Sequence, residues 1–140
     1  MQAHRTDADD DAFVEDFEQC RVAPADFDHR AHIRLAYAYL CNHEVEAAAR
    51  RMKSSLVRFL AHVGADPDKF HETMTRAWIL AVEHFMNVTG PAESSAAFIQ
   101  RAPDLLDKRI MLTHYSAETL FSEAARAGFV EPDKQPIPPR

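Results

Sequence analysis

Glycine is scarce in this sequence, with three among 140 residues, and no segment alternates apolar and polar residues as a half-buried strand does. Hairpin turns between strands commonly need glycine, because it adopts positive φ angles at little steric cost. Apolar residues instead recur every three or four positions, the spacing of one helix face. These features argue against a sheet protein and predict an all-α fold.

Long hydrophobic runs are absent as well, and the N-terminus has no apolar core region. A membrane span needs about 18 consecutive apolar residues, and a secretory signal needs a shorter apolar core, so we expect neither. The two cysteines, Cys20 and Cys41, are isolated and form no Cys-x-x-Cys pair. We therefore expect a cytoplasmic protein with reduced thiols and no membrane partner.

The charge balance and the absence of several motifs argue against nucleic-acid-binding proteins and against several classes of enzyme. The 16 basic and 22 acidic residues give a net charge of −6 without a basic stripe, which argues against a nucleic-acid partner. There is no glycine-rich phosphate loop and no Gly-x-Ser-x-Gly turn. A His-Glu-x-x-His protease motif fails because Thr75 replaces its second histidine, and the paired Glu-x-x-His motifs of di-iron proteins are missing.

The chain length fits one domain, and the apolar spacing divides it into about five or six helices. Residues 1–10 are polar and acidic, so we expect them to be disordered. Residues 11–130 should form a single-domain helical bundle. Residues 131–140 contain four prolines, which remove backbone donors and clash with a helix, so this tail should be extended.

Histidines lie on the apolar side of two predicted helices. The first helix follows Asp26 and places His29 and His32 on its apolar half. The second opens with Asp66 and Pro67, and its apolar stripe contains His71, Thr75, Met74, Trp78, Val82 and Phe85. Because an unpaired buried polar group costs about 1–3 kcal/mol, these imidazoles need partners.

A shared metal ion would satisfy all three imidazoles. His29 and His32 are one turn apart on a helix, and His71 would complete the set of nitrogen ligands. Asp28 is placed to orient His32 from behind. Iron, copper and zinc all accept imidazole, so the ligand type does not select the metal. The alternative is that each histidine hydrogen-bonds a carbonyl or carboxylate in the core.

Other candidate residues surround this predicted site. Glu72 is interpreted as a fourth ligand or an acid/base at the rim, with a solvent-side ion pair as the alternative. Thr75 lies on the His71 stripe and is interpreted as orienting a ligand or a water molecule, with a hydrogen bond to its own preceding turn as the alternative. Thr73 should point outward. Tyr115 is a candidate proton donor, with a backbone-anchored hydroxyl as the alternative.

Three motifs occur along the chain: DHxxH at 28–32, HETxT at 71–75 and YSxxxLxSxxAR at 115–126. With Val-Glu-Pro-Asp at 130–133, they resemble a family of small helical bacterial proteins of uncharacterised activity. The similarity extends from about Phe13 to Pro138. The resemblance implies that these motifs belong together, and it implies no activity.

Two functions are compatible with these features. The first is a metal-dependent enzyme that acts on a small molecule, using a metal-activated O₂ or water. The mostly apolar surroundings of the histidines favour oxidation over hydrolysis. The second is a non-catalytic helical module that binds a ligand or a partner and has structural core histidines. The sequence leaves the metal, the substrate and the oligomeric state open.

Overall fold

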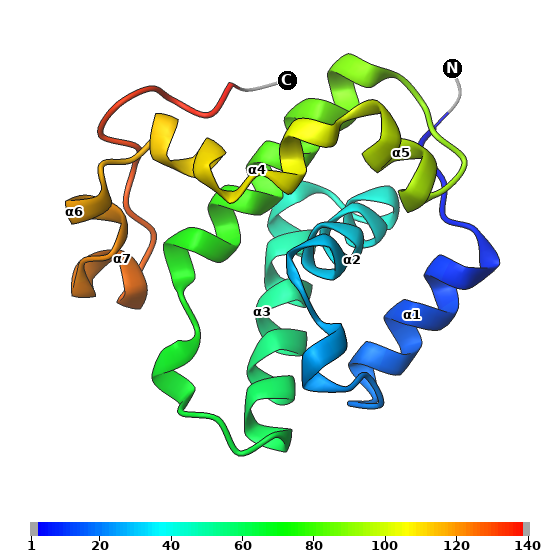
Figure 1. The fold of residues 1–140 in the computed structure, drawn as a ribbon, viewed down its shortest axis with the longest axis horizontal. Helices are drawn as coiled ribbons and strands as arrows, with labels where there is room; N and C mark the ends of the chain where they lie inside the picture. Colours follow the sequence, from blue (N-terminus) through cyan, green and yellow to red (C-terminus); the bar gives the residue numbers. More distant parts are fainter. Residues whose placement is uncertain (1–2, 139–140) are drawn as a thin grey trace.

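Three helices, α2 (His29–Asn42), α3 (Val45–His62) and α4 (Glu72–Thr89), form the centre of the computed structural model (Figure 1). The structure describes residues 3–138. Each of the three helices packs against the other two. Within the described residues every regular element is helical, which confirms the predicted all-α single-domain bundle.

Smaller helices surround this centre. Helix α1 (Ala8–Glu18) packs against α2 and α3, and α5 (Ser95–Arg101) packs against α2 and α4. Two short helices, α6 (Ala117–Leu120) and α7 (Glu123–Ala127), lie at the opposite edge, on the left in Figure 1, where α7 contacts α4.

Four short 3₁₀ segments connect the helices: η1 (Pro24–Asp26), η2 (Pro67–Lys69), η3 (Pro103–Leu106) and η4 (Lys108–Thr113). Three of them begin with proline, whose fixed φ suits the first helical position. The chain after Pro91 thus forms α5 followed by two 3₁₀ segments, η3 and η4.

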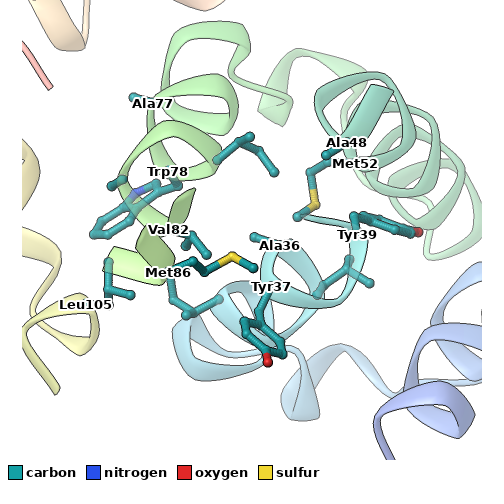
Figure 2. Packing of buried hydrophobic residues seen from close by; sticks show 14 of the residues in the cluster. Ala36, Tyr37, Tyr39, Ala48, Met52, Ala77, Trp78, Val82, Met86 and Leu105 are labelled. Atoms are coloured by element: carbon teal, nitrogen blue, oxygen red, sulfur yellow. The ribbon is translucent and has the colours of Figure 1, made fainter. Parts of the chain in front are cut away.

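Apolar side chains of the three central helices meet in one core. Met52 of α3 and Met86 of α4 point toward Ala36 of α2 (Figure 2). Tyr37 is fully buried, and its hydroxyl donates to the carbonyl of Arg5 at 2.9 Å. The core therefore reaches from the central helices to the N-terminal segment.

The predicted disorder of the N-terminal segment is wrong for residues 3–10, because helix α1 begins at Ala8 and side chains before it pack on the core. The His4 ring contacts Phe98, and its Nε2 hydrogen-bonds the Met86 carbonyl at 2.6 Å. Asp10 is almost fully buried. Residues 1–2 lie outside the described part of the chain.

The described part of the C-terminal tail, residues 131–138, contains no helix or strand. Asp133 anchors it by accepting hydrogen bonds from Ser116 and Thr119, and its pKa is lowered to about 2 by these bonds, those from Ser116 first. The Lys134 amide also donates to the His114 carbonyl at 2.9 Å. The extended shape predicted for residues 131–140 includes 139–140, which lie outside the described residues.

None of the helices in residues 3–138 is both long and apolar enough to cross a lipid bilayer. Cys20 and Cys41 are free thiols, as the sequence predicts.

Candidate functional site

A cleft of about 710 Å³ lies between the beginnings of α2 and α4 and the second half of α3. Residues of η4 and α6 form its remaining wall. The cleft brings together most of the predicted site, because His29, His32 and His71 all line it with Asp28 and Thr75. The cleft is therefore lined by residues of all three sequence motifs, since Leu120 belongs to the motif at 115–126.

The walls of the cleft are mainly apolar and aromatic. Helix α4 contributes Met74 and Trp78, and α3 contributes Phe59. Phe27, before α2, stacks on Phe17 with ring centroids 4.4 Å apart, which supports the wall from behind. The complete apolar lining is Phe27, Leu56, Phe59, Leu60, Phe70, Met74, Trp78, Met111, Leu112, Leu120 and Phe121.

The apolar stripe predicts that His71 lies within a helix. The structure instead makes His71 the N-cap of α4. Its Nδ1 accepts the Met74 amide at 3.0 Å, and its Nε2 donates to the Leu120 carbonyl at 2.7 Å. These two bonds require the neutral tautomer that carries its proton on Nε2. Neither ring nitrogen then has a lone pair available for a metal.

His29 is the first residue of α2. Its Nε2 donates to the Leu105 carbonyl at 2.8 Å, and its ring meets Trp78 edge-on with centroids 4.7 Å apart. No described residue hydrogen-bonds its Nδ1. His29 therefore has one structural nitrogen and one that is open to a ligand.

His32 lies one turn further along α2, and its ring packs edge-on against Phe27 at 6.0 Å. Within residues 3–138, no protein group hydrogen-bonds either ring nitrogen. Burial, and secondarily the neighbouring His29, lower the pKa of His32 to about 4. His32 is therefore a neutral imidazole with an unoccupied donor and an unoccupied acceptor.

Among the described residues, no group of three or more histidine, cysteine or carboxylate side chains is arranged to hold a metal ion. The cleft does not assemble the expected three-histidine set, because the backbone bonds of His71 use both of its nitrogens. Asp28 does not orient His32 either, since it is the N-cap of α2 and accepts the Ala31 amide at 2.9 Å.

Glu72 and Thr75 have different surroundings. Glu72 does not line the cleft, and its Oε1 accepts from Lys53 at 2.8 Å, which is the ion pair considered as the alternative. Thr75 is buried and lines the cleft. Thr73 does not point outward as expected; it is fully buried, donates to the Gly128 carbonyl and accepts the Val130 amide.

Tyr115 is buried and does not line the cleft. Its hydroxyl donates to the Val130 carbonyl at 2.6 Å, so it anchors the segment before the tail. Burial, followed by nearby Glu131, raises the pKa of this phenol to about 12. The structure thus gives Tyr115 the backbone-anchoring position that the sequence left as its alternative.

The opening of the cleft contains residues that sequence patterns did not single out. Lys69, Lys108 and Arg109 are exposed and line the cleft, and Phe121, which also lines it, is 58% exposed. Lys69 directly precedes Phe70 and His71 in the sequence, and this proximity to a predicted site residue could have indicated that it lies near the site. No local pattern indicated that residues 108–112 would return to the beginning of α2.

Comparisons with protein-family models, with curated proteins and with solved structures gave no significant match.

Proposed function

We propose that this protein binds a small, mainly apolar molecule in the cleft, and that His32 is the polar group that contacts it. The observation that carries this proposal is a neutral imidazole without a protein hydrogen-bond partner in an apolar cleft. Ligand sites commonly combine apolar walls with few polar groups, and their volumes are about 300–1,000 Å³.

The energetics of His32 favour a ligand at this position. A polar group that loses water without gaining a partner costs about 1–3 kcal/mol. His29 and His71 donate to carbonyl oxygens, whereas His32 is partly exposed and has no such bond within the described residues, so a ligand that covers its ring has to supply the hydrogen-bond partner. A ligand hydroxyl or carbonyl would pair with His32, because a neutral imidazole both donates and accepts.

Trp78 makes this proposal directly testable. It is the single tryptophan of the chain and lines the cleft, so its fluorescence reports on occupancy. The neutral fluorophore N-phenyl-1-naphthylamine serves as the probe. We expect saturable one-to-one binding, with energy transfer from Trp78 to the bound probe.

A pair of substitutions on α3 tests the location of the probe. Leu60→Phe enlarges a side chain that lines the cleft, whereas Val57→Phe makes a similar change at an exposed position outside it. We expect Leu60→Phe to weaken probe binding and Val57→Phe to leave it unchanged. No saturable binding, or equal effects of the two substitutions, would overturn the proposal.

A metal-dependent enzyme is the second candidate, and one observation favours it. The Nδ1 of His29 and both ring nitrogens of His32 have no hydrogen-bond partner in residues 3–138. These residues are one helical turn apart on α2. Iron, copper or zinc held there would take its remaining ligands from water and substrate, and would support oxidation or hydrolysis.

Metal analysis distinguishes the two candidates. The protein is incubated separately with Fe(II), Cu(II) and Zn(II), passed through a desalting column, and analysed for bound metal. One equivalent in the wild type and none in His32→Ala would support the enzyme, whereas no retained metal would exclude it. Glu72→Gln serves as the control, because Glu72 is paired with Lys53 outside the cleft.

A further inference from the structure

The opening of the cleft carries positive charge. Lys69, at the end of η2, and Lys108, at the start of η4, are exposed and have no carboxylate partner among the described residues. Arg109 is also at the opening but is paired with Asp107 at 2.8 Å. Two cationic side chains at the opening therefore remain available to an anionic partner.

This local charge is opposite to that of the whole chain. The protein has a net charge of −6, yet Asp28 is the one carboxylate among the described residues that line the cleft. The carboxylate of Asp28 accepts the Ala31 amide as the N-cap of α2, which ties it to the helix. A cationic opening on an acidic protein attracts anions to this cleft in particular.

The interior behind the opening differs sharply in character. Trp78 and Met74 line it with the other apolar residues named above, and His32 in it is neutral. Phe121 and Leu112 also line the cleft and are exposed, so apolar surface is present at its edge as well. Positive charge thus lies at the opening of the cleft, and apolar surface lies in its interior.

We infer that the ligand of this cleft is an amphipathic anion. Its apolar body lies against the interior walls, and its charged group lies at the opening near Lys69 and Lys108. This inference rests on the proposed ligand-binding function and adds the chemical class of the ligand. A small, fully polar anion fits less well, because it would cover apolar walls without burying apolar surface of its own.

Three probes with the same alkyl chain test the charge preference: decanoate, 1-decanol and decyltrimethylammonium. Their dissociation constants are measured by isothermal titration calorimetry below the micelle-forming concentration. Because each exposed ion pair strengthens binding by about a few-fold, two such pairs should make decanoate bind about tenfold more tightly than decanol. The preference should decrease with added salt, which screens exposed charges.

Two double substitutions locate the source of the preference. Lys69→Gln with Lys108→Gln should bring the affinity for decanoate down to that for decanol, while the affinity for decanol stays unchanged. The matched control, Arg50→Gln with Arg51→Gln, removes the same net charge from exposed positions of α3 outside the cleft. This control should retain the preference for decanoate.

The outcomes separate this inference from the proposed function. Equal binding of decanoate and decanol, or tighter binding of the cation, would overturn the anionic ligand and leave the apolar binding site intact. A preference that persists without Lys69 and Lys108 would also overturn it. Failure of all three probes, together with failure of the naphthylamine probe, would overturn the proposed function as well.

Discussion

His29, His32 and His71 line one cleft, but their ring nitrogens differ in what they contact. His71 uses both nitrogens in backbone hydrogen bonds, and His29 uses one. His32 has none within the described residues, and burial lowers its pKa to about 4. At the scale of single residues, the hydrogen-bonding capacity that these three histidines leave available is therefore at His32 and at the Nδ1 of His29.

The lowered pKa of His32 predicts a pH dependence of stability. Its pKa is about 4 in the folded protein and 6.5 as a free side chain, so between these values the unfolded chain binds more protons. Protonation of His32 should therefore lower the free energy of unfolding by about 3 kcal/mol as the pH falls from about 6.5 to below 4. Urea unfolding at a series of pH values measures this loss.

The contribution of His32 is isolated by His32→Gln, which cannot be protonated in this range. Its free energy of unfolding should fall less than that of the wild type toward acidic pH. His62→Gln is the matched control, because His62 is exposed at the end of α3, and it should retain the wild-type dependence. Parallel pH curves for His32→Gln and the wild type would contradict the prediction.

At the scale of elements, two imidazoles fasten one connecting segment to the central helices. His29, at the start of α2, donates to the Leu105 carbonyl of η3, and His71, before α4, donates to the Leu120 carbonyl of α6. The segment between these carbonyls includes η4 and forms part of the wall of the cleft. The two histidines therefore determine where this wall lies.

The double role of His71 can be separated by two substitutions. His71→Ala removes the N-cap of α4 and the bond to Leu120, and should lower the free energy of unfolding by about 2 kcal/mol. His71→Asn keeps a side-chain acceptor for the Met74 amide but is too short to reach Leu120, so its loss should be about half as large. Urea unfolding at neutral pH measures both, and equal losses would show that the cap contributes nothing.

Local signals predict most helices but misplace the beginning of α4. Gly64 and Gly90 follow α3 and α4 with positive φ angles, as helix-ending glycines do. Asp66 and Pro67 do open a helical turn, but this is η2, and the chain is extended at Phe70 before α4 begins. That short interruption moves His71 from the predicted stripe to the N-cap.

At the scale of the whole molecule, contacts between distant segments account for what the sequence could not predict. The histidines that the helical wheel grouped together do line one cleft, although His71 precedes α4 and does not lie within it. The wheel could not reveal their partners, because His29 and Leu105 are 76 positions apart and His71 and Leu120 are 49 apart. Backbone carbonyls carry no sequence signature, so a buried imidazole bonded to one resembles a metal ligand in a sequence pattern.

Asp10 is the clearest example of such a distant contact. Its buried carboxylate accepts from the Arg34 guanidinium of α2 at 2.9 Å and from the Ser95 amide of α5 at 2.8 Å. Burial raises its pKa, but the hydrogen bonds from Ser95 and Arg34 outweigh this and lower it below the usual value. One acidic residue of a segment expected to be disordered thus joins three helices.

Replacement of this carboxylate should destabilise the whole fold. Asp10→Asn has nearly the same size, but it leaves Arg34 without its counter-ion and places an amide donor among other donors. Removing one partner of a buried ion pair costs about 3–5 kcal/mol, and because Arg34 is partly exposed we expect about 2–3 kcal/mol.

Urea unfolding measures this loss, with Asp9→Asn as the matched control on the same turn of α1. Asp9 is exposed, so its replacement should change the free energy of unfolding by less than about 0.5 kcal/mol. Both variants change the net charge equally, so a general charge effect would destabilise them to the same extent. Equal losses would therefore contradict the role of Asp10, whereas a large loss confined to Asp10→Asn would show that α1, α2 and α5 depend on this one carboxylate.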